Sequence, residues 1–400
     1  MKFSVTSDVF IGAINKVIGV IPTRSTLPIL GNVYLNIEGN LLTVIGTDLE
    51  IYIKSTINVN GKMDGKIAIP AKRLETLLQN LGDRELNIEL QQNYKLVIKT
   101  KGARWMITGE DPNDFPLPSE LENKKTIEIN NVILCKYLSK AIHAASTDEL
   151  RRSMNGVFFE IKKNEFRIVS TDGHRLVKII RSNFDYEGDK INILVPIKTA
   201  QIINRLFKGT KYSDSKISSD ESNEQDIKNE EEEKTPTISS NVSINLNNEF
   251  LQCIFDNISI TSRLIDDTFP TYESVIPTDN EKTLKVEKLP LLGSVKRSII
   301  MSDEVTKRTS FNINDNELKV KAANNEYGTD SEETIECNYT DEEPFEIAFN
   351  GKYLLEAIQH FDCNEILFDF STPLKASVLR PSEQQENEEL MMLVMPVRNI

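Results

Sequence analysis

The segment Thr171–Leu176, which reads Thr-Asp-Gly-His-Arg-Leu, holds the residues of this chain whose types could do chemistry. A carboxylate and an imidazole two positions apart, Asp172 and His174, can act together as acid and base or hold a metal ion. The chain has only 3 histidines, however, and no second His or Cys lies nearby at a ligand spacing. A metal-dependent nucleic-acid hydrolase that uses Asp172 and His174 is therefore the enzyme hypothesis, and a structural turn is the alternative that we favour.

The surrounding elements occur three times, which supports the turn. The segment Arg167–Arg175 matches LTVIGTDLE at Leu42–Glu50 and LKVKAANNE at Leu318–Glu326. Each is followed by a short apolar strand and an amphipathic helix, in IAIPAKRLETLLQNL from Ile67, ILVPIKTAQIINRLF from Ile193 and IAFNGKYLLEAIQHF from Ile347. Two matched elements at matched separation indicate a tandem triplication. A turn shared by three repeats is more easily structural than catalytic.

The repeats become even once one segment is removed. Positions 70 to 196 span 126 residues, whereas positions 196 to 350 span 154, an excess of 28. The 28 residues from Lys211 to Ile238 are almost all polar or acidic, so they have little to bury and should form a disordered insertion. A regulatory loop and a neutral surface insertion both fit this composition. The domains expected are 1–125, 126–277 with the insertion at about 211–238, and 278–400.

Hydrophobic periodicity predicts an α+β fold in which two helices pack on antiparallel sheet in each repeat. Pro70 and Pro196 suit the first helical turn, and Leu86–Thr100 has the alternation of a hairpin. The predicted helices are Ser7–Val20, Pro70–Leu81, Asn131–Ala145, Pro196–Lys208, Lys288–Met301 and Asn350–Phe361.

Positive charge is concentrated in these helices, although the chain has a net charge of −14. They contain twelve basic residues against three acidic ones, Asp8, Glu75 and Glu356. Ordinary surface helices would carry Glu in similar number, so the imbalance indicates that a polyanion lies against them. Phosphate contacts give affinity without reading sequence, and no base-reading motif is present. The charge predicts non-specific binding to duplex nucleic acid; a linear architectural DNA-binding protein is a third hypothesis.

Other features of the sequence bear on the cellular compartment and on possible partners. Cys135, Cys253, Cys337 and Cys363 lie far apart without metal-ligand spacing, which favours reduced thiols and a cytoplasmic protein. No run approaches 18 apolar residues, and no signal-peptide pattern is found near the start. The end of the chain is an apolar strand followed by Met395-Pro396-Val397-Arg398, which fits either plain core or a surface for docking a partner.

The chain resembles the bacterial sliding clamp, the beta subunit of DNA polymerase III, over essentially its whole length. The resemblance rests on segments in matching order and spacing: MKFSV, Thr26–Asn32, Gly46–Glu50, Asp114–Pro116, Asn155–Glu160, Thr171–Leu176, Phe269–Tyr272 and the terminal Val-Met-Pro-Val-Arg. It implies a non-catalytic processivity factor without cofactor or metal. Two protomers would join head to tail in a ring around duplex DNA and tether the replicative polymerase, the clamp loader and other proteins at the nucleoid.

The resemblance also assigns roles to residues. Those at the protomer interface would be Arg104, Ile300 and Met301. Together with the helix charges, it places these basic residues against DNA: Arg24, Lys72, Arg73, Lys136, Lys140, Arg152, Lys198, Arg205, Lys296 and Arg297.

A peptide-docking pocket between the second and third domains is implied as well, at one joint only. Its residues would be Met154, Thr171, Gly173, His174, Arg175, Leu176, Pro270, Val275, Asn350, Tyr353, Leu374, Met395, Pro396, Val397 and Arg398. Three features depart from the family. Ser274 stands where Arg is frequent, Arg152 and Ser153 replace tyrosines on a DNA-contacting loop, and the chain ends Arg398-Asn399-Ile400.

Overall fold

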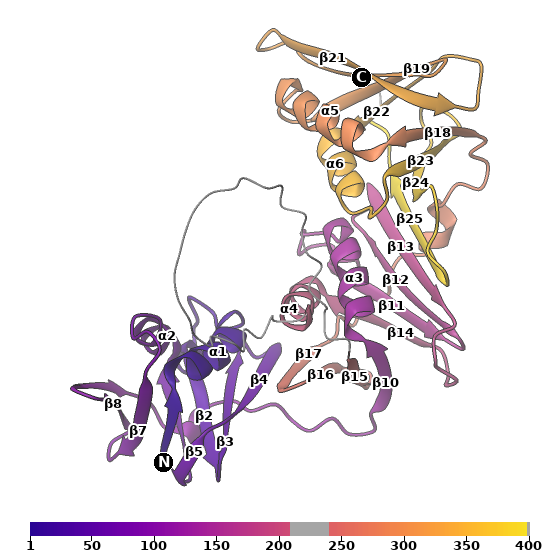
Figure 1. Cartoon of the computed structure of the whole chain (residues 1–400). Coiled ribbons are helices and arrows are strands. Elements are labelled where there is room, and N and C mark those ends of the chain that lie inside the picture. Colours follow the sequence, from indigo (N-terminus) through magenta and orange to yellow (C-terminus); the bar gives the residue numbers. More distant parts are fainter. Residues whose placement is uncertain (209–239, 398–400) are drawn as a thin grey trace, which may run out of the picture. The chain divides into compact units, whose positions relative to one another are not determined.

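A computed structural model describes residues 1–208 and 240–397 of the chain (Figure 1). Six α-helices occur in the described part: α1 (Ser7–Ile18), α2 (Ala71–Gln79), α3 (Asn131–Ala141), α4 (Ile197–Phe207), α5 (Lys288–Met301) and α6 (Gly351–Gln359). The expected insertion Lys211–Ile238 lies outside the described residues, and so does Arg398. Contacts divide the chain into two compact units, residues 1–135 with 202–263, and residues 136–201 with 264–400.

The first unit contains two antiparallel sheets. The five-stranded sheet has the order β5 (Asn60–Met63), β1 (Lys2–Thr6), β7 (Glu85–Gln91), β8 (Lys95–Thr100), β9 (Ala103–Thr108). The eight-stranded sheet has the order β10 (Lys125–Asn130), β15 (Asn241–Leu246), β16 (Phe250–Phe255), β17 (Ile258–Arg263), β4 (Ile51–Asn58), β3 (Leu41–Thr47), β2 (Asn32–Glu38), β6 (Gly65–Pro70). It joins strands of the first and second repeats because β17 pairs with β4, where Ile260 lies opposite Ile53.

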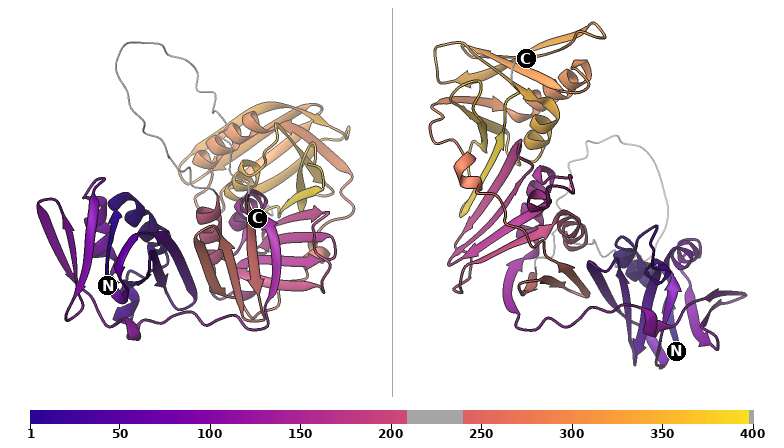
Figure 2. Two further views of the ribbon diagram at one scale, coloured as in Figure 1. Left: turned by 60° about the horizontal axis from the view of Figure 1, so that its bottom comes forward. Right: turned by 180° about the vertical axis from the view of Figure 1, so that it is seen from behind.

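The second unit is built around one succession of twelve strands. Their order is β14 (Ile191–Pro196), β11 (Gly156–Lys162), β12 (Glu165–Thr171), β13 (Arg175–Ser182), β25 (Glu388–Val394), β24 (Ser377–Pro381), β23 (Glu365–Phe370), β18 (Lys282–Glu287), β21 (Thr329–Tyr339), β20 (Glu317–Asn324), β19 (Arg308–Asn314), β22 (Phe345–Asn350). The second and third repeats meet where β13 pairs with β25, so a sheet again crosses from one repeat to the next (Figure 2).

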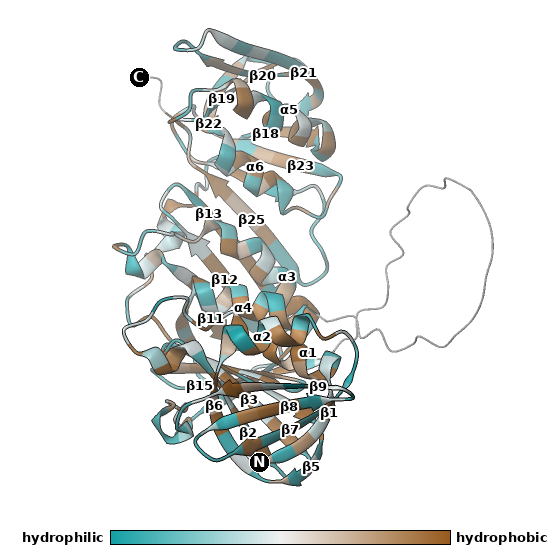
Figure 3. Ribbon diagram, turned by 90° about the vertical axis from the view of Figure 1, so that its left-hand side faces the viewer, coloured by the Kyte–Doolittle hydropathy of each residue, from teal (hydrophilic) through white to brown (hydrophobic). Residues whose placement is uncertain are grey.

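The predicted α+β architecture, with helices packed on antiparallel sheet in three repeats, is confirmed. Side chains along β4 point alternately to the two faces of the sheet, so that Ile51 and Ile53 are buried and Lys54 is exposed. In α1, Phe10, Ile14 and Val17 are fully buried at helical spacing. Figure 3 shows the complementary pattern, with hydrophilic residues along α2 and a largely hydrophobic β25.

The triplication extends to single hydrogen bonds. In each repeat, a residue just after an end strand donates its amide to the carbonyl two positions before the Pro or Asn that precedes the second helix. The bonds are Glu110 to Ala68 at 2.9 Å, Ile265 to Leu194 at 3.0 Å and Val397 to Ala348 at 2.7 Å. Equivalent bonds at equivalent positions show that the repeats share backbone geometry as well as sequence pattern.

Several predicted boundaries were wrong. Pro70 and Pro196 end strands β6 and β14 and do not lie in the first helical turn. Pro70 has φ −51° but an extended ψ of 108°, so α2 begins one residue later, at Ala71. The first helix ends at Ile18, the third ends at Ala141 and continues as a 3₁₀ turn through Ala144, and the last ends at Gln359. Only Lys288–Met301 has the predicted bounds.

Two further expectations concern chemistry and membranes. None of the four cysteines forms a disulfide, and Cys135 and Cys253 are buried, as expected for reduced thiols. Burial raises the pKa of the Cys253 thiol to about 12. Among the described residues, no helix is long and apolar enough to cross a membrane.

Candidate peptide-docking site and basic helices

The residues Thr171–Arg175 form a tight turn between β12 and β13. The Asp172 Oδ1 atom accepts hydrogen bonds from the backbone amides of His174 at 2.9 Å and Arg175 at 3.0 Å. Thr171 Oγ1 accepts the amide of Gly173, whose φ of +88° is a conformation that suits glycine. The Asp172 carboxylate therefore organises the turn.

The other repeats use the same device. In the first repeat, Asp48 Oδ1 accepts the amides of Glu50 at 3.1 Å and Ile51 at 2.8 Å. In the third, Asn324 Oδ1 accepts the amide of Glu326 at 2.9 Å. An amide side chain does the same work as the two carboxylates, so the structural interpretation of this segment is confirmed. Among the residues that the structure describes, no group of three or more His, Cys, Asp or Glu side chains could hold a metal ion.

Arg175 connects this turn to α6. Its guanidinium pairs with Asp172 at 3.0 Å and with Glu356, and it lies 4.5 Å from the centroid of the Tyr353 ring. The imidazole of His174 is stacked beside the same tyrosine, 6.1 Å from its centroid. Two carboxylates and an aromatic face thus hold Arg175, which fixes the second repeat's turn against the third repeat's helix.

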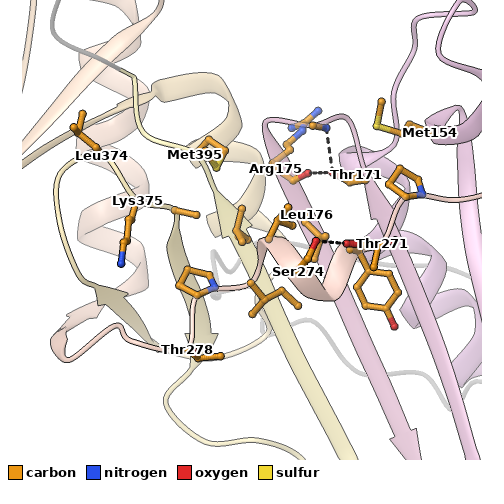
Figure 4. Close-up of a pocket in the computed structure, with 18 of the residues that line it drawn as sticks. Met154, Thr171, Arg175, Leu176, Thr271, Ser274, Thr278, Leu374, Lys375 and Met395 are labelled. Carbon is orange, nitrogen blue, oxygen red and sulfur yellow. Dashed lines mark hydrogen bonds between the residues drawn. The ribbon is translucent and has the colours of Figure 1, made fainter.

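A cavity of about 570 Å³ opens beside this turn (Figure 4). Its size is that of a small-molecule or peptide side-chain site. The buried residues Leu176 and Leu393 belong to the apolar cluster beneath it. Nine of the residues predicted from the family resemblance line it: Met154, Thr171, Gly173, Arg175, Leu176, Pro270, Val275, Leu374 and Met395.

The remaining predicted pocket residues that the structure describes lie outside the lining. Asn350 caps α6, because its Oδ1 accepts the amides of Lys352 and Tyr353. Pro396 forms an isolated bridge with Phe349, which extends the chain end along β22. His174, Tyr353 and Val397 likewise hold the elements around the cavity in place.

Sequence reasoning missed much of the opposite wall. It is formed by a loop and a 3₁₀ turn that follow β17, together with the β23–β24 turn and one residue of β25: Thr271, Tyr272, Ser274, Ile276, Pro277, Thr278, Asp279, Lys375, Ala376 and Leu393. Ser274 Oγ donates to the carbonyl of Thr271 at 2.7 Å and so stabilises that 3₁₀ turn. Thr271 and Tyr272 belong to the Phe269–Tyr272 segment that carries the family resemblance, and Ser274 stands where the family frequently has Arg, so the sequence offered a signal for these three. The other residues share no motif or periodicity, so only the folded chain reveals them.

The predicted excess of positive charge on the helices holds for the observed boundaries. The six helices contain eleven basic and three acidic side chains, one basic residue fewer than expected because α4 ends before Lys208. Many of the basic residues predicted to face DNA are exposed, namely Arg24, Lys72, Arg73, Arg152, Lys198, Arg205, Lys296 and Arg297. Some of them are also paired: Arg297 holds Glu333 through two hydrogen bonds of 2.7 and 2.6 Å.

Lys136 and Lys140 depart from this pattern. The Lys140 side chain is nearly fully buried; its Nζ donates to the carbonyl of His360 at 2.8 Å and lies 2.6 Å from Asp362. Lys136 pairs with Glu388 at 2.7 Å. Both ammonium groups are committed to elements of the third repeat, so we remove these two lysines from the set expected to contact DNA.

A histidine pair lies beside Lys140. The rings of His143 and His360 stack with their centroids 4.2 Å apart and an interplanar angle of 8°. Burial, and then the electrostatic influence of His360 and Arg175, lower the pKa of His143 to about 3. His143 is therefore neutral in the folded chain at physiological pH.

The residues expected at a protomer interface are exposed. Arg104 lies on β9, an edge strand that pairs with β8 on one side only. Ile300 in α5 is 75% exposed, and Leu289 at the other end of that helix is 76% exposed. Met301 is also exposed.

Comparisons with known proteins agree along the whole chain. Family models of the DNA polymerase III beta subunit match its N-terminal domain at residues 1–121, its central domain at 128–235 and its C-terminal domain at 273–398. A curated beta sliding clamp of Vibrio cholerae is 26% identical over 399 residues, covering 100% of both chains. That of Staphylococcus epidermidis is 25% identical over 409 residues, covering 100% of this chain and 99% of the relative.

Solved structures give the same result. A sliding clamp of Pseudomonas aeruginosa, bound to griselimycin, superposes with a TM-score of 0.88 at 25% identity, covering 100% of each chain. The sliding clamp of Bacillus subtilis superposes with a TM-score of 0.87 at 21% identity over 100% of both chains, and at that identity it supports the fold alone.

Proposed function

Because this chain belongs to the family of DNA polymerase III beta subunits, the bacterial sliding clamps, we propose that it encircles duplex DNA and tethers the replicative polymerase. It is a processivity factor that makes and breaks no bonds itself. The observation that carries the proposal is the excess of basic side chains on the helices of an acidic chain. Contacts with phosphates supply affinity but no sequence preference, so the protein can slide.

The ring would form from two copies joined head to tail. Within one chain, β17 pairs with β4 and β25 pairs with β13, each time joining the last strand of one repeat to the strand after the turn of another. The equivalent elements are β9 of the first repeat, which lies at the edge of its sheet, and the first part of β21 in the third repeat, which precedes the residues Cys337–Tyr339 that pair with β18. We assign these two edges to each other across the protomer joint, with Arg104 on one side and Ile300 and Met301 near the other. Three repeats in each of two copies give closed, pseudo-sixfold geometry.

The proposed domains are 1–125, 126–277 and 278–400, each contributing two helices to the inner face. The DNA-facing set is that of the exposed basic residues: Arg24, Lys72, Arg73, Arg152, Lys198, Arg205, Lys296 and Arg297. Because these contacts are weak individually and the ring is closed, retention depends on topology more than on affinity. This is how a clamp can hold on without stopping the polymerase.

The partners would dock in the cavity beside Arg175. Apolar walls around Leu176 and Leu393, bordered by polar side chains such as Thr171 and Ser274, suit an extended peptide that inserts aliphatic and aromatic side chains. The replicative polymerase subunit, the clamp loader and other proteins with such peptides would share this one site. We place the protein in the cytoplasm, at the nucleoid.

The alternative functions meet specific obstacles. A hydrolase would need Asp172 as a reactive group, whereas its oxygens accept two backbone amides and pair with Arg175. An architectural protein that binds along DNA would be retained equally on linear and circular DNA, whereas a closed ring would be retained on circular DNA and would slide off linear DNA. The retention of loaded protein on circular and linearised DNA therefore distinguishes a closed ring from such a protein.

A further inference from the structure

The docking cavity has an ionic end that the family resemblance does not assign. Of the described residues that line it, three carry charge: Arg175, Asp279 and Lys375. Figure 4 shows Leu374 and Lys375 at the end of the cavity opposite Met154. The three charged groups differ in how firmly they are held, and this difference decides which of them can recognise a ligand.

Arg175 is already committed. Two carboxylates, Asp172 and Glu356, and the ring of Tyr353 surround its guanidinium, and its side chain is only 11% exposed. A ligand carboxylate would have to displace a partner from a largely desolvated, multiply bonded group, and breaking such a pair is costly. Arg175 therefore shapes the cavity and offers little to an incoming charge.

Lys375 is in the opposite state. Its Nζ pairs only with Asp279 among the interactions that the structure records for it, and the two side chains are 49% and 55% exposed. Water solvates both charges, so an exposed pair of this kind contributes little to stability and exchanges easily. A peptide carboxylate can take the place of Asp279 at Lys375 with small loss.

The backbone around this pair is fixed, so Lys375 stays at the cavity wall. The amide of Lys375 donates to the carbonyl of Thr372 in the β23–β24 turn at 3.2 Å. The Asn280 side chain donates to the carbonyls of Asp369 at 2.9 Å and Ala376 at 3.3 Å, which ties the segment after Asp279 to that turn. The backbone of Lys375 is thus held by hydrogen bonds, whereas its ammonium group can exchange Asp279 for another carboxylate.

We propose that Lys375 is a specificity-determining residue, which selects docked peptides that place a carboxylate at the Leu374–Lys375 end of the cavity. Asp279 acts as the competing internal carboxylate and limits this preference. The inference rests on the proposed docking function of the cavity and adds a preference for charge to it. Apolar side chains of the peptide fill the part of the cavity near Leu176, and an acidic side chain pairs with Lys375.

An Asp scan tests this preference on the full-length protein. The probes are fluorescein-labelled octapeptides with two leucines and one phenylalanine as fixed anchors, with Asp placed in turn at each other position and an Asn twin for each. Fluorescence anisotropy gives the affinity ratio of each pair. At one scan position we expect the Asp peptide to bind about threefold more tightly than its twin.

Variants that change the charge of Lys375 or Asp279 test whether Lys375 causes that preference for Asp. Lys375→Glu should reverse it at the same position, and Asp279→Asn should enlarge it, because the competitor is removed. Lys285→Glu is the matched control, since Lys285 is half-exposed on β18, pairs with Glu365 at 2.8 Å and does not line the cavity. It should leave every ratio unchanged.

The outcomes are distinct. Peptides that bind without any Asp preference, or a preference that survives Lys375→Glu, would overturn the role of Lys375 and leave docking intact. Failure of every peptide to bind the unaltered protein would instead overturn the docking function on which the preference rests.

Discussion

The backbone amide of Met395 donates a hydrogen bond of 2.8 Å to the carbonyl of His174. At the corresponding joint in the first unit, the amide of Arg263 donates to the carbonyl of Glu50 at 2.9 Å. In both cases the last strand of one repeat is bonded to the turn of another, and one of these two joints carries the cavity that we propose as the docking site. At that joint Gly173 and His174 follow Asp172 in the turn, whereas the first joint has Leu49 and Glu50 at these positions. The end of the chain adds Met395 to the cavity wall.

Deletion of residues 395–400 should abolish peptide docking. It removes Met395 from the cavity wall and breaks the bonds from Met395 to His174 and from Val397 to Ala348. Anisotropy with a labelled Leu/Phe peptide should show at least a tenfold loss of affinity, whereas light scattering should show the same mass as the full chain. Unchanged affinity would contradict the placement of the site.

Charge reversal on α4 should weaken DNA retention. The double variant Lys198→Glu and Arg205→Glu removes two exposed cations from a helix, and each lost phosphate contact should lower the slope of log K against log salt by about 0.9. The matched control is Lys285→Glu with Lys321→Glu, which reverses two half-exposed lysines on strands. Equal effects of the two double variants would show that general charge, and not the helical layer, is responsible.

Lys140→Met should reduce stability and leave DNA binding nearly unchanged. The substitution keeps the apolar stem but leaves the carbonyl of His360 without the Nζ donor, at a cost of about 1–3 kcal/mol. Urea unfolding measures the loss, and Lys352→Met on the exposed face of α6 should cost less than about 0.5 kcal/mol. A strong loss of DNA retention with normal stability would return Lys140 to the DNA-facing set.

The free energy of unfolding should decrease as the pH falls, because of His143. The pKa of His143 is lowered to about 3 in the folded chain, from 6.5, so between these values the unfolded chain binds a proton that the folded chain does not. The stabilisation from its neutral form is complete above pH 6.5 and declines as pH falls, by up to about 1.4 kcal/mol per pH unit. Urea unfolding at pH 7, 6 and 5 should show this slope, and His143→Gln should flatten it. An equal slope in the variant would refute the assignment to His143.

Much of the fold was readable from the sequence because its signals are local and repeated. The bounds of α5 were predicted correctly, and the turn role of Asp172 followed from its counterparts at Asp48 and Asn324. What could not be predicted depends on contacts between distant segments. Nothing near Lys140 indicates that it meets His360, 220 positions away. Likewise the pairing of Lys375 with Asp279 arises only when the β23–β24 turn folds against the loop after β17.

The central claim is that the protein holds DNA by topology, and one measurement tests it directly. The protein is loaded by its clamp loader onto a nicked circular plasmid, freed of unbound protein by gel filtration, and divided into two samples, one of which is linearised by a single restriction cut. A ring predicts that the protein remains with the circle and is lost from the linear DNA within minutes. Retention on both forms, or rapid loss from both, would contradict the account.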